Sequence, residues 1–455
     1  MIKIYNSLTN KLEDFIPIKE GEVSMYVCGP TVYNNLHIGN SRPVIFFDTV
    51  ARFFKYLGYK VTYVSNFTDI DDKIIKKAAE EGVSEKEIST RYIKVVLNLY
   101  HRLNCLPHDA NPKVTENMEG IIDFINKMVE NGAAYAIDGD VYFDVLKIKE
   151  YGILSGQTVD NLLNGVRIEN NDKKHNPIDF TLWKTTDAGV KWDSPWGPGR
   201  PGWHTECVVM IDNIFNGKID IHGGGNDLKF PHHDNEIAQS LAVNGHMIAN
   251  YWIHNGRVDI AGEKMSKSLG NIIWADDLLD EIGTPVYRLM MLNVPYRQLL
   301  NYKEELVSGS KADYEKIRRP FVSCFRKLEL NGMIDDVKED YYRDFESAEV
   351  KAVVSEFIDS MSNDFNTANA LTAIIKMTKM INNDLRNREI NYDNLKEELR
   401  ALKSMLWVLG INVEVKPLSK EDIELVKEWT NAKSIKDFEK ADKLRGEIMS
   451  RGIEL

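Results

Sequence analysis

The chain has 455 residues, of which 43% are hydrophobic, so it can bury the cores of about two to four domains. Its formal net charge of −12 disfavours indiscriminate nucleic-acid binding, because affinity for phosphate backbones depends on lysine and arginine, so any RNA contact must be local. No apolar run approaches the ~20 residues that span a bilayer, and the four cysteines form no CxxC pair. We therefore expect a cytoplasmic protein without a membrane anchor. We also expect a monomer, an expectation that these features do not address.

The first hundred residues predict the start of a parallel sheet. Val23–Val27 is typical of a buried strand, Pro43–Leu57 has the apolar spacing of a helix, and 60–67 is typical of a second strand. Ligands of such sheets collect at the carboxyl ends of the strands, and Cys28 and Thr68 directly follow the two strand-like runs. The sequence therefore predicts an α/β fold with a site at this edge.

The pattern of apolar residues changes after the first hundred residues. Between about 111 and 202 the runs are short and the loops are rich in glycine and proline, which indicates an inserted subdomain. Strand-like runs resume at 218–222 and 251–258. From Val286 onward the apolar spacing is helical. The last helix is predicted to end before Gly452, which suits the position after a helix C-cap.

Two motifs suit the chemistry of a nucleotide triphosphate. Attack on the α-phosphate of ATP builds negative charge on phosphoryl oxygens, so a catalyst needs positioned donors and cations. HIGN at 37–40 and KMSKS at 264–268 could supply both, and Gly39 leaves room for close approach of a nucleotide. A helix that begins after Asn40 would point its N-terminus at phosphate. Taken alone, HIGN could be a capped helix start and KMSKS a mobile basic loop.

A second group of residues has the donor types of a zinc site. Cys28 and Cys207 could supply thiolates, and a helical segment from His232 would place Glu236 on the same face as His232 or His233. Spacing alone does not choose between the two histidines. The alternative is that the thiols are buried apolar groups and the histidines lie on the surface.

Five strings occur in a fixed order along the chain, namely CGPTVYNNLHIGN, NFTDIDDK, WHTEC, IHGGGNDLKFPHHDNE and KMSKS. Together they closely resemble the cysteinyl-tRNA synthetases, a class I aminoacyl-tRNA synthetase family, over essentially the whole catalytic half. The resemblance implies a Rossmann-type catalytic domain that activates L-cysteine with ATP and transfers it to tRNA(Cys), with Mg²⁺ accompanying the ATP. It also implies one zinc ion per chain, held by Cys28, Cys207, His232 and Glu236, which favours His232 over His233.

The resemblance also assigns roles in catalysis. His37, Lys264 and Lys267 are implied to stabilise the transition state and the triphosphate, with Gly39 and Asn40 completing the ATP site. The family usually has a second histidine where this chain has Asn40, and asparagine can donate a hydrogen bond but cannot carry charge. The implied cysteine pocket is formed by Thr68, Trp203 and Asp227.

Zinc offers a physical basis for selecting cysteine. Cysteine differs from serine by sulfur in place of oxygen, and a pocket that reads only shape gains little from that change. Zn²⁺ binds thiolate strongly, whereas a hydroxyl is a harder and less acidic ligand. We therefore expect no separate editing domain. Because catalytic zinc normally keeps an open position, Glu236 is expected to yield when the substrate sulfur arrives.

The resemblance divides the chain into five segments. They are a first catalytic half at 1–110, an inserted acceptor-end subdomain at 111–202, a second catalytic half at 203–300, a helical stem-contact and bundle domain at 301–412 and a small anticodon-binding tail at 413–455. A rival interpretation is a ligase that passes activated cysteine to a small amine, but the helical extension from Val286 favours tRNA. A non-catalytic RNA-binding paralogue is disfavoured, because the motif residues are intact.

Overall fold

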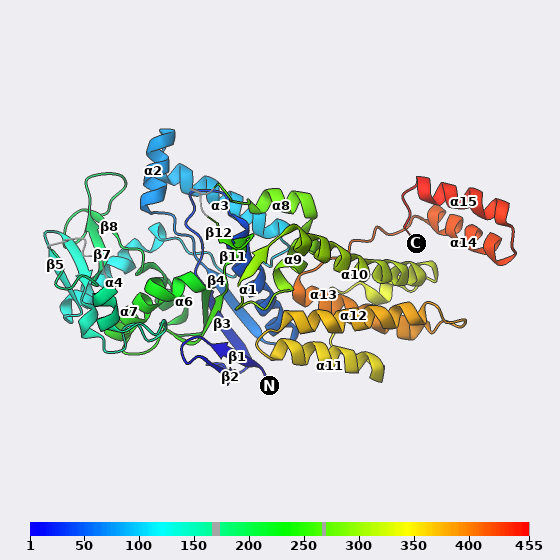
Figure 1. Cartoon of the computed structure of the whole chain (residues 1–455), viewed down its shortest axis with the longest axis horizontal. Helices are drawn as coiled ribbons and strands as arrows, with labels where there is room; N and C mark the ends of the chain where they lie inside the picture. The colour runs from blue at the N-terminus through cyan, green and yellow to red at the C-terminus, as the bar shows by residue number, and fades with distance from the viewer. Residues whose placement is uncertain (166–172, 266–269, 455) are drawn as a thin grey trace. The chain divides into compact units, whose positions relative to one another are not determined.

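The protein forms two compact units in a computed structural model that describes residues 1–165, 173–265 and 270–454. The first unit consists of Met1–Glu281 and Tyr296–Tyr302. The second consists of Ile282–Pro295 and Lys303–Leu455. Both are seen in Figure 1.

A four-stranded parallel sheet organises the first unit, with strand order β10-β9-β3-β4. Its strands are β3 (Glu22–Val27), β4 (Lys60–Ser65), β9 (Ile219–Gly225) and β10 (Ala249–Asn255). Such strands are covered on both faces, and most residues of these four strands are buried. The chain passes from β3 to β4 on one side and from β9 to β10 on the other. The carboxyl ends of β3 and β9 therefore form a topological switch point, where ligands of open α/β sheets bind.

Helix α1 (Ile38–Tyr56) crosses from β3 to β4 and begins earlier than the sequence predicts. The expectation that it begins after Asn40 is wrong, because His37 is the N-cap residue and Asn40 is the third residue of the helix. Because the helix begins at Ile38, the HIGN motif itself forms the start of the helix. Pro43 lies inside the helix.

The predicted inserted region contains a separate sheet of order β5-β6-β7-β8, in which all neighbouring strands are antiparallel. Helix α4 (Met118–Glu130) packs against β5. The other elements are β5 (Ala134–Ile137), β6 (Asp140–Phe143), β7 (Phe180–Thr185), β8 (Gly199–Pro201), the short helices η1 (Thr115–Asn117) and η2 (Val145–Lys147), and α5 (Val159–Gly165).

The rest of the first unit surrounds the parallel sheet. A small sheet of order β12-β11-β13 carries Lys264 at its edge. The elements are β1 (Lys3–Asn6), β2 (Lys11–Asp14), α2 (Asp72–Glu81), α3 (Glu85–Arg102), α6 (Glu206–Phe215), η3 (Asn226–Leu228), η4 (Lys229–His233), α7 (Asp234–Asn244), β11 (Val258–Ile260), β12 (Glu263–Lys264), α8 (Ala275–Ile282) and β13 (Leu300–Tyr302).

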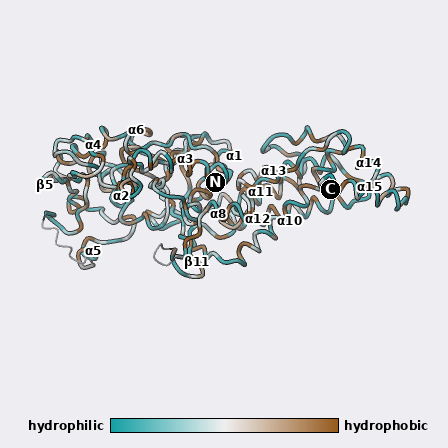
Figure 2. The backbone as a smooth tube through the Cα atoms, turned by 90° about the horizontal axis from the view of Figure 1, so that it is seen from above, coloured by the Kyte–Doolittle hydropathy of each residue, from teal (hydrophilic) through white to brown (hydrophobic). Residues whose placement is uncertain are grey.

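The second unit is helical, as the spacing from Val286 predicts. Its helices are α9 (Thr284–Leu292), α10 (Glu304–Leu330), η5 (Ile334–Val337), α11 (Ala348–Ser362), α12 (Thr367–Asp384), α13 (Tyr392–Leu409), α14 (Lys420–Ser434) and α15 (Phe438–Ser450). Helices α10 to α13 pack on one another around a buried core, and α14 pairs with α15. Apolar and polar stretches alternate along these helices (Figure 2), as amphipathic packing requires. Helix α15 ends before Gly452, whose φ is +67°, as predicted.

None of the helices in the described part of the chain combines the length and the apolar character needed to cross a membrane.

Candidate functional site

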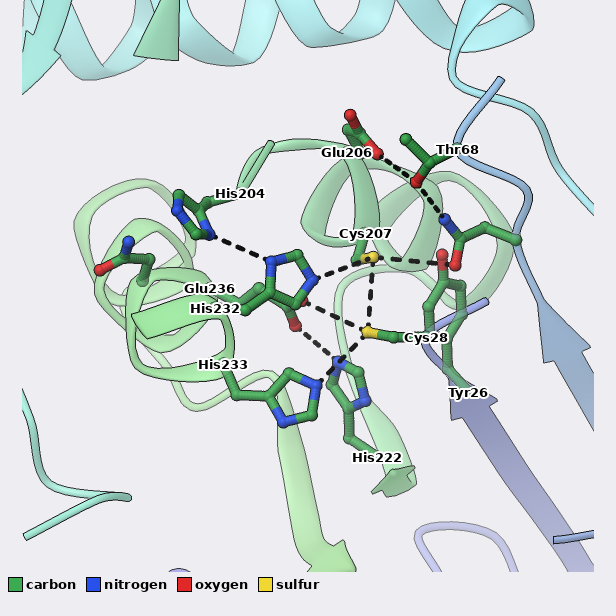
Figure 3. A network of polar contacts seen from close by, with 12 residues as sticks. Tyr26, Cys28, Thr68, His204, Glu206, Cys207, His222, His232, His233 and Glu236 are labelled. Atoms are coloured by element: carbon green, nitrogen blue, oxygen red, sulfur yellow. Dashed lines mark hydrogen bonds and ion pairs between the residues drawn. The ribbon is translucent and has the colours of Figure 1, made fainter. Parts of the chain in front are cut away.

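Four side chains from separate segments meet at the switch point between β3 and β9. Cys28 follows β3, Cys207 lies in the first turn of α6, His232 lies in η4 and Glu236 on α7. We call these four residues the four-donor cluster. Figure 3 shows their side chains pointing toward one another. The backbone N–H of Cys28 donates to Gly223 of β9 at 3.2 Å, which fixes the loop after β3 to the neighbouring strand.

The four donor atoms all lie within 4.8 Å of one another. Cys28 Sγ lies 3.6 Å from both Cys207 Sγ and Glu236 Oε1. Cys207 Sγ lies 3.8 Å from His232 Nε2, which lies 2.9 Å from Glu236 Oε1. Two thiols, an imidazole and a carboxylate facing one point are compatible with a metal ion. The structure thus brings together all four metal ligands that the sequence predicts.

The structure also presents a second group of donors, formed by Cys28, His222, His233 and Glu236, which we call the alternative donor set. His233 Nε2 lies 3.3 Å from Cys28 Sγ, and His222 Nε2 lies 2.5 Å from Glu236 Oε2. Cys28 and Glu236 belong to both groups. Geometry therefore leaves open the choice between His232 and His233 that the spacing also left open.

Burial and neighbouring charges shape the electrostatics of the cluster. Burial raises the pKa of Cys28, while the hydrogen bond from Cys28 lowers the pKa of Cys207 to about 6. Burial disfavours the charged form of Glu236, but His222 and His232 outweigh burial and lower its pKa. The thiol pair thus loses one proton readily and the second only with difficulty. A bound cation would favour loss of both protons, because it stabilises thiolates directly.

The three residues of the predicted substrate pocket occupy different environments. The indole of Trp203, which is 42% exposed, stacks on the ring of His232 with centroids 4.5 Å apart and planes at 24°. Thr68 is buried after β4, and its hydroxyl donates to Glu206 Oε2 at 2.9 Å. Asp227 is exposed in η3, directly after β9. Trp203 thus covers one side of the cluster.

The start of α1 has the features of an anion site. His37 Nδ1 accepts the backbone N–H of Gly39 at 3.1 Å, so the proton of the neutral ring lies on Nε2, which can donate. Asn40 Oδ1 accepts the backbone N–H of His37 at 3.1 Å. A helix N-terminus adds backbone donors and a favourable dipole for phosphate.

The two nucleotide motifs of the sequence lie beside each other. A Cβ added at Gly39 would come within 2.9 Å of Met265 Cε, so Gly39 is in close contact with the KMSKS motif. The segment after that motif is also fixed to α1, since the backbone N–H of Ile38 donates to Ile273 at 3.0 Å. Lys264 is exposed on β12. Lys267 lies outside the described residues.

Sequence reasoning missed several polar residues around the cluster. Glu206 and His222 occur within the strings WHTEC and IHGGG, but neither string indicates that Glu206 meets Thr68 or that His222 meets Glu236. Asn66, which lies two residues before Thr68, is not predicted either. No local pattern identifies the contacts of any of the three, although Glu206 directly precedes the predicted ligand Cys207.

Comparisons with known proteins agree with this geometry. The family model for "tRNA synthetases class I (C) catalytic domain" matches residues 14–312, and the "DALR domain" model matches 356–414. The cysteine–tRNA ligase of Anoxybacillus flavithermus is 42% identical over 456 residues, covering 100% of this chain and 97% of that protein. The cysteine–tRNA ligase of Acholeplasma laidlawii is 44% identical over 457 residues, covering 99% and 100%.

Among solved structures, the fold resembles a Mycobacterium tuberculosis methionyl-tRNA synthetase in complex with methionyl-adenylate. The TM-score is 0.62 at 16% identity, with 85% of this chain and 90% of the other covered. At this identity the likeness concerns the fold alone, and it confirms the predicted α/β catalytic domain followed by helices.

Proposed function

This chain belongs to the cysteine–tRNA ligase family of ATP-dependent class I aminoacyl-tRNA synthetases, and from that premise we propose that it selects L-cysteine with a zinc ion held by the four-donor cluster. The observation that carries this proposal is the pair of thiols 3.6 Å apart at the switch point, facing His232 and Glu236.

The donor separations suit zinc. Tetrahedral zinc with bonds of 2.0–2.3 Å places its ligand atoms roughly 3.3 to 3.8 Å apart. Three of the separations within the cluster are 3.6, 3.6 and 3.8 Å. The fourth, 2.9 Å between His232 and Glu236, is a hydrogen-bond distance. The four-donor cluster contains both thiols and the alternative donor set only one, so the preference of zinc for thiolate favours the former.

When bound, zinc would supply a Lewis acid that prefers the sulfur of cysteine to the hydroxyl oxygen of serine. The chain's own residues would hold the rest of the amino acid. Trp203 would exclude water from one side of the thiol site, and Asp227 and Thr68 would receive the ammonium group. Glu236 would be the ligand that yields to the substrate.

Formation of cysteinyl-adenylate would depend on positioned charge rather than on a covalent enzyme nucleophile. The cysteine carboxylate attacks the α-phosphate of ATP while Mg²⁺ accompanies the triphosphate. His37 would donate from Nε2 to a phosphoryl oxygen, and Asn40 would hold the His37 backbone in place. Lys264 and Lys267 would stabilise the departing pyrophosphate.

Transfer to tRNA(Cys) would involve the second unit. The match to the DALR domain lies in α11 to α13, and we assign the α14–α15 pair to the anticodon. Trp429, with Lys433 Nζ 4.3 Å from its ring centroid, is a candidate for stacking on a single-stranded base. We further propose that the enzyme is cytoplasmic and acts as a monomer.

The test is charging of total tRNA with labelled cysteine and, in parallel, labelled serine, using zinc-replete enzyme and ATP. We expect charging with cysteine only, together with about one zinc per chain. Cysteine-dependent ATP turnover without charged tRNA would instead indicate a ligase for a small amine. Equal charging with serine would contradict selection by zinc.

A further inference from the structure

Three buried polar side chains form a chain of hydrogen bonds next to the four-donor cluster. Asn66 Nδ2 donates to Thr68 Oγ1 at 3.5 Å, and Thr68 Oγ1 donates to Glu206 Oε2 at 2.9 Å. Asn66, Thr68 and Glu206 are 1%, 3% and 3% exposed. Figure 3 shows Thr68 and Glu206 beside Cys207. None of the three belongs to the cluster or to the alternative donor set.

The backbone around this chain of bonds is fixed. Asn66 Oδ1 accepts the backbone N–H of Gly29 at 2.9 Å, and the backbone N–H of Thr68 donates to Pro30 at 3.3 Å. A Cβ at Gly29 would come within 1.7 Å of the Asn66 carbonyl oxygen, so the loops after β3 and β4 approach too closely for any other residue there. The backbone that carries Thr68 is therefore held against the loop after β3.

In the structure, Glu206 Oε2 is the acceptor of the Thr68 hydroxyl proton. A threonine hydroxyl has one donor and two acceptor positions. The proton is given to Glu206, and one lone pair receives the amide of Asn66. A single lone pair then remains, so any further partner of Thr68 must be a donor.

We propose that Glu206 is a positioning residue that keeps Thr68 an acceptor for the ammonium group of the amino-acid substrate. This inference rests on the proposed function, which places Thr68 in the cysteine pocket. Without the acceptor on Glu206, the Thr68 proton would be free to rotate, and part of the binding free energy of the ammonium group would be spent on turning it away. An acidic side chain with no contact to the substrate would thus contribute to the recognition of its amino group.

The test compares three thiols that differ in their charged groups. Cysteine has an ammonium and a carboxylate, cysteamine has only the ammonium and 3-mercaptopropionate has only the carboxylate. Their dissociation constants are measured by calorimetry on zinc-loaded wild type and on Glu206→Met, which approximates the size of glutamate without an oxygen acceptor. We expect affinity for cysteine and cysteamine to fall about ten-fold or more, with affinity for 3-mercaptopropionate nearly unchanged.

Three further variants control for structure. Glu206→Gln keeps a carbonyl acceptor and is expected to restore ammonium binding. Thr68→Val, which tests the same hydrogen bond if Glu206→Met fails to fold, is expected to show the same ligand-selective loss. Asp212→Asn removes an acid from the same helix away from Thr68 and should bind all three thiols as wild type does. Zinc content is measured for each protein.

Equal loss of affinity for all three thiols in Glu206→Met would overturn the inference, because Glu206 would then act on the metal or on the pocket as a whole. Selective loss of 3-mercaptopropionate would overturn it too, because Thr68 would then donate to the carboxylate. If wild-type enzyme fails to charge tRNA with cysteine, the proposed function fails. If wild type succeeds and Glu206→Met binds cysteine normally, only this inference fails.

Discussion

His37 and Asn40 cap the start of α1 reciprocally. The imidazole of His37 accepts a backbone N–H at 3.1 Å, and Asn40 Oδ1 accepts the backbone N–H of His37 at 3.1 Å. Asn40 therefore has a definite role, which is to fix the backbone from which His37 projects. The amide oxygen of Asn40 accepts this hydrogen bond without carrying a charge.

This relationship predicts different effects of two substitutions at Asn40. Asn40→Ala removes the cap, so the adenylation rate should fall, together with about 1 kcal/mol of stability. Asn40→Asp keeps an acceptor but adds a negative charge near the triphosphate, so KM for ATP should rise while stability is kept. Pyrophosphate exchange and thermal unfolding distinguish the two. A lower KM for ATP in Asn40→Asp would contradict the placement of phosphate here.

Gly39 is expected to tolerate a side chain poorly. In Gly39→Ala the new methyl would lie 2.9 Å from Met265 Cε and 3.0 Å from the His37 ring, so the ring must move. The adenylation rate should fall at least about ten-fold, because catalysis depends on the position of the donor. Single-turnover adenylate formation measures this rate. The control is Gly309→Ala, where a Cβ meets nothing within 4 Å, and its rate should match wild type.

The four-donor cluster and the alternative donor set predict different zinc affinities when His232 or His233 is replaced. His232→Ala should lower zinc affinity more than His233→Ala, because only His232 belongs to the group with both thiols. Loss of a residue that merely supports a ligand costs about 10- to 100-fold in affinity, and loss of a ligand should cost more. Competition with a chelator gives both affinities. The reverse order would assign zinc to the alternative donor set.

Replacing a thiol should affect both the metal and the amino acid. Cys28→Ser should retain less zinc and activate cysteine more slowly, since a serine hydroxyl is a harder and less acidic ligand than a thiol. Metal analysis and cysteine-dependent pyrophosphate exchange check the two effects. Cys105→Ser serves as the matched control, as Cys105 belongs to neither donor group. Normal zinc and full activity in Cys28→Ser would refute the assignment.

Glu398 in the helical unit predicts a pH dependence of stability. Burial, with a smaller effect of Asp384, raises the pKa of Glu398 from its ordinary 4.5 to about 8. Within the described residues Glu398 Oε2 has no hydrogen-bond partner. Between those two pH values the folded state holds a proton that the unfolded state has lost, so the contribution of Glu398 to stability falls as pH rises.

Glu398→Gln should therefore raise the Tm more at pH 8 than at pH 5, because the amide stays neutral at both. Thermal unfolding followed by circular dichroism at the two pH values measures the difference. Glu389→Gln, at an exposed position, should shift the Tm equally at both. An equal shift for Glu398→Gln would show that the buried carboxyl does not titrate in this range.

The sequence by itself determined the donor types and the class of chemistry. HIGN and KMSKS indicated an ATP site, and the strings around Cys28, Cys207, His232 and Glu236 indicated zinc. Both predictions were possible because residue type and local spacing are given directly by the amino-acid sequence. Most strand and helix predictions were sound for the same reason. The run 251–258, however, is divided between β10, which ends at Asn255, and β11, which begins at Val258, and α1 begins earlier than predicted. A reciprocal cap between His37 and Asn40 extended that helix beyond its apolar pattern.

Only the tertiary structure decided which side chains meet. Thr68 and Glu206 are 138 residues apart in the chain, and Cys28 and Cys207 are 179 apart, yet both pairs are in contact. Periodicity describes one element at a time and carries no information about such pairs. The order of the parallel strands places the loops after β3, β4 and β9 at one edge, and that placement joined the predicted ligands and introduced His222 and Glu206, which no local pattern could identify.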